Sequence, residues 1–448
     1  MLKLSGDLPS QALTLYKAGR LREAESTLLQ LREFTPDHWF LLAQIRMAKG
    51  LWQHALQALD QIPMRDRAHP SCCVVEGNAC KELNRFSDAI EAYNSALASQ
   101  PDFVPALTNR AALHLLMGNL DLAEADLLNA LQLNPGFPDA NFHLGAIRLH
   151  QGDFATGWLL YESRLQTALC SKLGRCYDLS RRWSGLFEEL PNKRLLVYGE
   201  QGLGDVVQFS RFLPLLINKG IKVILQIPLP LHRLFVRYWP NLILMDSVAP
   251  YEGGFDRYCS LISLPHLLGI KAPPAQPWMI TANTLKTYKR THKPKVGLVW
   301  SGLSVRDLER YTPTRRSIGL EALLPILSQD VNFVSLQLNT KPEDRALMAQ
   351  VGIEDISEQL TDFYETALVL DTLDLLISID TSVIHLAGAL GVPAWVRLPT
   401  VSDYRWSGRA QGSAWYPNIR IFRQASPGDW SIPVAEVAQA LGQKFGLI

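Results

Sequence analysis

The pattern of apolar and polar positions changes near residue 190 of the 448-residue chain. Before this point, apolar residues recur at helical spacing and short turn motifs separate helix-length segments. After it, short apolar runs alternate with helix-length segments, which is typical of a parallel sheet covered by helices. The sequence therefore predicts a helical array followed by an α/β region.

Five turn motifs recur through the first 165 residues: AGRLREAE, KGLWQHAL, LNRFSDAI, MGNLDLAEA and QGDFATGW. Spacings of 31, 34, 34 and 34 separate their turn residues, Gly19, Gly50, Asn84, Gly118 and Gly152. Small residues flank the turns, which lets two antiparallel helices pack closely; these are Ala12, Ala43, Gly77, Ala111 and Gly145 before them, and Ala24, Ala55, Ala89 and Ala123 after them. A period of 34 is that of the tetratricopeptide repeat (TPR), a helix–turn–helix unit.

The fifth unit departs from the others. Gly157 replaces the expected alanine, and the segment GWLLYESRL is bulky and aromatic. This predicts a terminal repeat that docks on another part of the chain; an ordinary capping repeat is the alternative. TPR arrays present a concave surface, so we expect a protein or peptide partner in the groove. A rigid spacer or dimerisation arm is the other interpretation.

The α/β region separates into two parts. The first contains predicted strands at 194–199, 222–228, 242–246 and 257–265, and the second at 295–302, 332–338, 375–380, 393–399 and 419–424. A stretch rich in proline and lysine, 271–295, lies between them and is typical of a linker. We therefore predict TPR repeats over 1–168, one Rossmann-like domain over 169–280, a linker over 281–294 and a second Rossmann-like domain over 295–448.

Charge and cysteine usage limit the function classes. The formal net charge is +1, so no electrostatic signal for nucleic acid or an anionic membrane is present. No apolar run is long enough for a membrane span, and the amino terminus lacks an apolar signal-peptide core. The 6 cysteines show no metal-binding spacing, which favours reduced thiols in a cytoplasmic protein.

A glycine-rich motif, GEQGLGDVVQFSR, follows the first predicted strand of the α/β region. Its glycines, Gly199, Gly202 and Gly204, permit close approach of a ligand. The motif lacks the lysine of a Walker A loop and the GxGxxG spacing of a dinucleotide fingerprint. Asp205 is then either a helix cap or a catalytic base. Pro214 should kink or divide the helix that follows.

A second motif, SIDTSVIHLAGALGVP, places Asp380 at a strand end and His385 in the first turn of the next helix. Thr381 or Ser382 can cap that helix, whose amino terminus favours a phosphate; a normal cap with a packed histidine is the alternative. Between the motifs lies the basic loop SGLSVRDLERYTPTRRS, whose Arg315 and Arg316 could clamp a diphosphate or simply be solvated.

Five segments match one known pattern in colinear order: GEQGLGDVVQFSRFLPLL, VGLVWSG, RRSIGLEALLPIL, DLLISIDTSVIHLAGALGVPAWVRLP and RWSGR with the following SAWYPNIRIFRQ and GDW. In this the chain resembles bacterial TPR proteins that carry a heptosyltransferase-like glycosyltransferase domain of the family 9 type. The resemblance implies a GT-B fold, in which two Rossmann-like domains face each other. It also implies that a final helix, here 430–445, returns to the first domain.

The resemblance further implies an inverting, metal-independent transfer of sugar from a nucleotide sugar to an acceptor hydroxyl. By its motif positions Asp205 is the catalytic base. The donor is expected to contact Trp300, Ser301, Gly302, Arg316, Asp380, Thr381, Ser382 and His385. The acceptor-side loop comprises Glu200, Gln201, Gly202, Gly204 and Gln208.

Two departures from the family pattern leave the donor sugar open. The loop after VWSG lacks the usual asparagine, and Ser382 stands where heptosyltransferases have glycine. The expected substrate is therefore a nucleotide sugar of unspecified sugar and base, with no cofactor and no metal. Two other functions remain: a non-catalytic TPR adaptor whose GT-B domain binds a ligand, and an epimerase of the same architecture.

Overall fold

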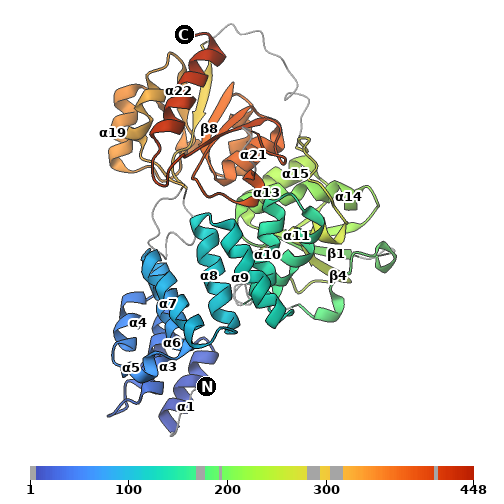
Figure 1. Cartoon of the computed structure of the whole chain (residues 1–448). Coiled ribbons are helices and arrows are strands. Elements are labelled where there is room, and N and C mark those ends of the chain that lie inside the picture. Colours follow the sequence, from blue (N-terminus) through green and yellow to red (C-terminus); the bar gives the residue numbers. More distant parts are fainter. Residues whose placement is uncertain are drawn as a thin grey trace. The chain divides into compact units, whose positions relative to one another are not determined.

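The computed structural model describes residues 7–167, 177–190, 194–279, 293–302, 316–407 and 412–447. The chain divides into two compact units, with the boundary between Leu144 and Gly145 inside helix α10 (Pro138–His150). The second helix of the fifth repeat, α11 (Phe154–Tyr161), thus belongs to the α/β unit (Figure 1).

The first unit is a stack of helix pairs, as the 34-residue period predicts. Each helix packs on its pair partner, and each pair packs on the next. The pairs are α1 (Asp7–Lys17) with α2 (Leu21–Leu28), α3 (Pro36–Ala48) with α4 (Trp52–Leu59), α6 (Pro70–Glu82) with α7 (Phe86–Ser99), and α8 (Val104–Met117) with α9 (Leu120–Leu133). A short helix, α5 (Met64–Arg67), precedes the third pair.

Backbone geometry explains why the turns fall where they do. All five predicted turn residues have left-handed φ angles: 74° at Gly19, 75° at Gly50, 59° at Asn84, 82° at Gly118 and 85° at Gly152. This conformation ends a helix and suits glycine or asparagine. The predicted small residues lie between the paired helices. A Cβ on Gly77, for example, would lie 2.5 Å from Cε1 of Tyr93.

The second unit contains two parallel sheets. The first has the order β3-β2-β1-β4, with β1 (Arg194–Tyr198), β2 (Lys222–Ile227), β3 (Ile243–Asp246) and β4 (Arg257–Ser260). The second has the order β10-β9-β8-β5-β6-β7, with β5 (Lys295–Leu298), β6 (Asn332–Ser335), β7 (Glu354–Asp355), β8 (Leu375–Ile379), β9 (Ala394–Leu398) and β10 (Ile419–Arg423). Strand order reverses beside β1 in the first sheet and beside β5 in the second. Such switch points are where α/β sheets bind ligands.

The helix after β1 is divided, as Pro214 predicts. It runs as α13 (Leu203–Phe209), a 3₁₀ turn η4 (Ser210–Phe212) and α14 (Leu213–Ile217), with the proline in the first turn of α14. A proline there loses no hydrogen bond that the helix needs. The other helices of this unit are α15 (His232–Tyr238), α16 (Leu264–Leu267), α18 (Leu324–Leu327), α19 (Pro342–Val351), α20 (Phe363–Leu370), α21 (Ser382–Leu390) and α22 (Ser431–Phe445).

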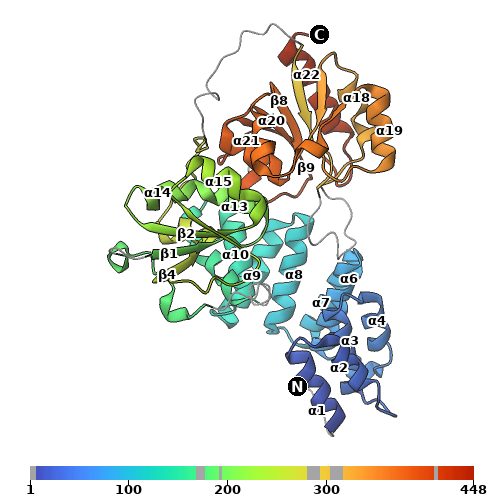
Figure 2. The same ribbon diagram turned by 180° about the vertical axis from the view of Figure 1, so that it is seen from behind.

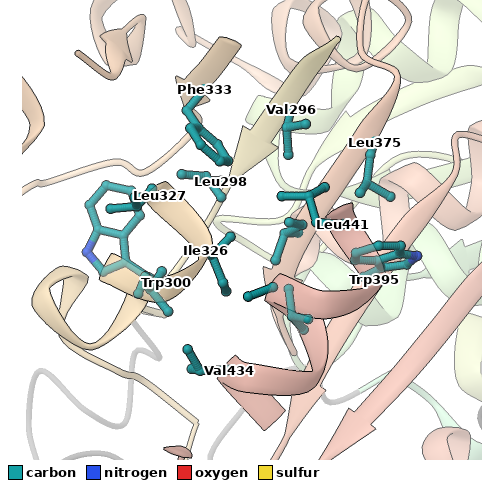
Figure 3. Packing of buried hydrophobic residues seen from close by; sticks show 14 of the residues in the cluster. Val296, Leu298, Trp300, Ile326, Leu327, Phe333, Leu375, Trp395, Val434 and Leu441 are labelled. Carbon is teal, nitrogen blue, oxygen red and sulfur yellow. The ribbon is translucent and has the colours of Figure 1, made fainter. Parts of the chain in front are cut away.

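The last helix, α22, packs on its own sheet. Val434, Val437 and Leu441 are buried in one core with residues of β5 and β8, and Figure 3 shows Val434 and Leu441 among these side chains. The helix also contacts α18 and β10. The expected return of 430–445 to the first α/β domain is therefore corrected, because the apolar face of α22 is used within the second.

The two remaining expectations concern the predicted linker and membrane-spanning helices. Of the predicted linker, residues 281–292 lie outside the described part of the chain. No helix among the described residues combines the length and the apolar character that a membrane crossing requires.

Candidate functional site

Two helix amino termini meet in the second unit. α13 follows β1 of the first sheet, and α21 follows β8 of the second, so each begins at a switch point. The two helices pack against each other, and Figure 2 shows them together from behind. Gly204 allows this contact, because a Cβ there would lie 2.7 Å from Cδ2 of His385 and 3.3 Å from Cα of Ser382. The structure thus brings both sequence motifs to one place.

Both carboxylate oxygens of Asp205 have partners. Gly202 is the N-cap of α13, and its N–H donates to Oδ2 of Asp205 at 3.0 Å. Oδ1 accepts from Nη2 of Arg405 at 2.7 Å. Asp205 therefore does cap its helix, from the third position rather than as the N-cap residue. Arg405 is the partner that the sequence analysis missed.

Arg405 lies in a 3₁₀ turn, η9 (Tyr404–Trp406), after β9. Its side chain is 10% exposed, and its Nε lies 3.1 Å from Oδ1 of Asp403. Burial alone lowers the pKa of Arg405, but the charges of Asp403 and Asp205 raise it well above its usual value. Burial also raises the pKa of Asp403. The centre of the site is thus a permanent cation held between carboxylates.

His385 joins α21 to this centre. Its Nδ1 lies 2.7 Å from the Tyr416 hydroxyl, its ring stacks on Trp406, and its Nε2 lies 3.5 Å from Oδ1 of Asp380. Burial raises the pKa of Asp380, but His385 and Arg316 lower it more, to about 2. Arg316 is half exposed, with its Nη1 3.6 Å from Oδ2 of Asp380. Arg315 lies outside the described residues.

The strand-end loops of β5 and β8 touch beside α21. A Cβ on Gly302 would lie 3.2 Å from Cγ2 of Thr381. Thr381 is the N-cap of α21, but its side chain makes no capping hydrogen bond, and Ser382 is the first helical residue. The N–H of Ser301 donates to Gln337 at 2.8 Å. These four predicted donor residues therefore gather at one helix terminus.

Two of the predicted contact residues have buried side chains. The Trp300 side chain is 1% exposed and packs in the core of the second sheet, with its Nε1 bonded to Asp344, so it faces no ligand. Glu200 is 5% exposed and bonds to Arg164 rather than facing an acceptor. Gln201 is exposed, with a left-handed φ of 62°. The direction of the strand or loop decides which way each of these side chains points, and a sequence motif alone does not show that direction.

Buried polar atoms without hydrogen-bond partners gather around the Asp205–Arg405 pair. Within the described chain they include Gln208 Nε2 and Oε1, Trp406 Nε1 and Trp415 Nε1. Burying such a group unpaired is costly, so nearly all in native proteins are satisfied by protein or water.

The described residues contain no cluster of three or more His, Cys, Asp or Glu that could hold a metal ion. Cys72, Cys73, Cys80 and Cys259 are free and buried. Burial raises the pKa of Cys72 to about 11, so its thiol stays protonated at neutral pH. Cys170 and Cys176 lie outside the described residues.

Replacing Asp380 with asparagine should make the free energy of unfolding depend less on pH in the acid range. The folded pKa of about 2 lies below the ordinary 3.8, so ionised Asp380 stabilises the fold above pH 3.8 and loses this effect as pH falls towards 2. At pH 7 the loss on substitution is on the order of 2 kcal/mol. Urea unfolding at pH 7 and pH 2 measures it. A deficit that stays constant across this range contradicts the assignment.

Comparisons with known proteins match the helical repeats more often than the α/β unit. The tetratricopeptide repeat family model matches residues 10–71, 75–136 and 109–163. Protein FlbA of Caulobacter vibrioides is 29% identical over 435 residues, which cover 86% of this chain and 70% of FlbA. The E3 ubiquitin-protein ligase CHIP of Arabidopsis thaliana is 36% identical over 101 residues, 22% of this chain and 34% of CHIP.

Solved structures match the helical part. A thermophilic TPR protein of Thermus thermophilus is 23% identical, with a TM-score of 0.32 over 36% of this chain and 90% of its own. YrrB, described as a TPR protein with an unusual peptide-binding site, is 14% identical, with a TM-score of 0.28 over 36% of this chain and 84% of its own. The family model and the helix pairs show that the amino-terminal part of the chain consists of tetratricopeptide repeats.

Proposed function

We propose that the α/β unit is an inverting, metal-independent glycosyltransferase of the GT-B type that uses a nucleotide sugar. The observation that carries this proposal is the Asp205–Arg405 ion pair, formed where helices from two parallel sheets meet at their amino termini. Both helices start at switch points, where ligands bind in such sheets. A carboxylate beside a cation and a helix terminus suits transfer of a sugar from a diphosphate.

The donor diphosphate is proposed to bind beside the second sheet, at the amino terminus of α21. The amino terminus of α21 favours an anion through its dipole and its N–H groups. Arg405 and the half-exposed Arg316 offer guanidinium groups, which match phosphate oxygens geometrically. The indole of Trp406, which stacks on His385 of this helix, offers one further N–H donor.

In the proposed step, Asp205 takes a proton from the acceptor hydroxyl as that oxygen attacks the anomeric carbon. The new carbon–oxygen bond forms while the bond to the diphosphate breaks, and the nucleoside diphosphate leaves with the electron pair. A helix terminus supplies about 0.3–2 kcal/mol, whereas enzymes supply about 8 kcal/mol or more. Arg405 and the positioned base must therefore carry most of the stabilisation.

The ion pair itself defines a resting state. With Oδ1 of Asp205 bonded to Arg405 and Oδ2 to Gly202, each oxygen already accepts one hydrogen bond, and Oδ1 is turned towards the guanidinium. A bound diphosphate competes with Asp205 for the same guanidinium. Donor binding thereby releases Oδ1 for the acceptor hydroxyl.

The TPR array is proposed to recruit the acceptor or another protein partner, because stacked repeats present extended binding surfaces. One observation favours the alternative, a non-catalytic adaptor with a ligand-binding GT-B domain. The capping hydrogen bond and the ion pair give Asp205 a structural role even without turnover.

A panel of nucleotide sugars separates the two functions. Calorimetry of the full chain identifies which sugar binds, and chromatography of the same mixture detects release of nucleoside diphosphate. The enzyme proposal predicts binding with slow release even without acceptor, through hydrolysis. Binding with no release over many hours supports the adaptor instead, and absence of binding by every member of the panel contradicts both.

Arg405→Gln should weaken nucleoside diphosphate binding at least about tenfold, because a charged hydrogen bond contributes about 1.5–3 kcal/mol. Arg345→Gln is the matched control, since Arg345 is an exposed arginine of α19 in the same half. Titration of each folded variant with nucleoside diphosphate gives the two dissociation constants. Equal affinity in both variants would remove Arg405 from the donor site.

A further inference from the structure

A buried ion pair ties the terminal TPR unit to the loop that carries Asp205. Arg164 lies in a 3₁₀ turn, η1 (Glu162–Gln166), directly after α11. Its Nη2 donates to Oε1 of Glu200 at 2.5 Å and its Nε to the same oxygen at 3.1 Å. The two side chains are 4% and 2% exposed, so this contact is shielded from water.

The pair sits at the switch point of the first sheet. Arg164 Nη2 also donates to the hydroxyls of Ser260, the last residue of β4, at 3.3 Å and of Ser263, just after it, at 3.0 Å, while Glu200 follows β1. Ser260 in turn donates to Glu200. Glu162 holds the other side of the guanidinium through Nη1 at 2.6 Å. One arginine of the repeat therefore fixes the ends of two neighbouring strands.

The loop beyond Glu200 is short and held at both ends. Gln201 has a left-handed φ of 62° and a side-chain hydrogen bond with Tyr161 of α11. Gly202 comes next and donates its N–H to Asp205. The terminal unit thus anchors two consecutive residues, Glu200 and Gln201, immediately before the cap that orients the Asp205 carboxylate.

Helix α11, which directly precedes Arg164, packs closely against α10. α10 and α11 cross through two glycines: a Cβ on Gly145 would lie 2.7 Å from N of Tyr161, and a Cβ on Gly157 would lie 2.9 Å from N of Leu149. Backbones in such close contact leave little room for sliding. The position of η1, and so of Arg164, follows the crossing of these two helices.

We propose that Arg164 is a positioning residue, through which the terminal TPR unit sets the geometry of Asp205 for sugar transfer. This inference rests on the proposed function. Replacing a buried ion pair with neutral groups often costs little stability, so stability alone does not explain the pair. Geometry does, because a misplacement of about 1 Å at a reacting group can cost about 100-fold in rate.

The test uses the double variant Arg164→Gln/Glu200→Gln in the full chain. It removes both charges of the pair together and leaves Glu162 paired with Arg182, whereas Arg164→Gln alone would leave Glu200 buried and unpaired. The expected result is a kcat lowered at least about tenfold, a KM for the donor within about twofold of wild type, and a thermal midpoint close to wild type. The matched control is Arg110→Gln/Asp126→Asn, which removes an arginine–aspartate pair inside the repeats of the first unit and should keep wild-type kcat.

A wild-type kcat in the folded double variant overturns the proposal, as does a loss of kcat that the control pair shows equally. Hydrogen exchange of the peptide covering 199–209 gives a readout that needs no turnover. The double variant should exchange faster there and unchanged in the peptide covering 375–390. If wild type shows no turnover, the proposed function fails, and unchanged exchange at 199–209 overturns the positioning role separately.

Discussion

Asp205→Asn is expected to lower kcat for sugar transfer about 100- to 10,000-fold, the usual contribution of a general base. Asparagine keeps the shape of the side chain and can still accept the N–H of Gly202, so the helix cap should persist. The donor competes with the Asp205 carboxylate for Arg405, so its affinity should be at least that of wild type. Single-turnover rates and donor titration on the same preparation measure the two quantities.

Asp403→Asn is the comparison that isolates the base. Asp403 also contacts Arg405, at 3.1 Å, so both variants remove one carboxylate neighbour of the same cation. Only Asp205 lies on the glycine-rich loop of α13. We expect Asp403→Asn to lose less than tenfold in kcat. Similar losses in both variants would show that Asp205 acts only as a partner of Arg405.

Trp158→Ala should destabilise the α/β unit by about 3–5 kcal/mol, the range for deleting a buried tryptophan. The Trp158 side chain is 2% exposed and makes edge-to-face contacts with Phe209 of α13, Tyr404 of η9 and Trp415. These residues come from both α/β halves, so the terminal repeat docks as its aromatic sequence predicts. Each aromatic pair adds about 0.5–1.5 kcal/mol beyond burial.

Denaturant unfolding followed by circular dichroism measures this loss. Trp158→Phe keeps an aromatic ring that is smaller than the indole, so its denaturant midpoint should lie between those of wild type and the alanine variant. An alanine variant that unfolds at the wild-type midpoint would show that the docking contacts contribute nothing to stability.

Local signals account for the parts of the fold that the sequence predicts. Gly19, Gly50 and Asn84 mark turns because a left-handed residue is needed where two helices reverse, and a fixed period repeats that need. Apolar runs identify the strands because both sheets are parallel and covered by helices. β7, with only 2 residues, has too short a pattern to recognise.

The parts of the site that sequence reasoning missed depend on contacts between distant residues. Arg405 is 200 positions from Asp205, and although it begins the matched segment RWSGR, no local pattern pairs it with that carboxylate. Arg164 is likewise one basic residue among several in the repeats until the fold places Glu200 against it. Trp300 is the opposite case. It belongs to a matched motif, but the alternation of side chains that continues from the strand turns its side chain into the core.

A crystal structure of the full chain with a nucleoside diphosphate tests the central claim most directly, through the distance between Arg405 and Asp205. The account predicts a diphosphate at the amino terminus of α21, within hydrogen-bond distance of the Arg405 guanidinium, with Oδ1 of Asp205 released from that arginine. A nucleotide bound elsewhere, with the Arg405–Asp205 contact still at 2.7 Å, would contradict it.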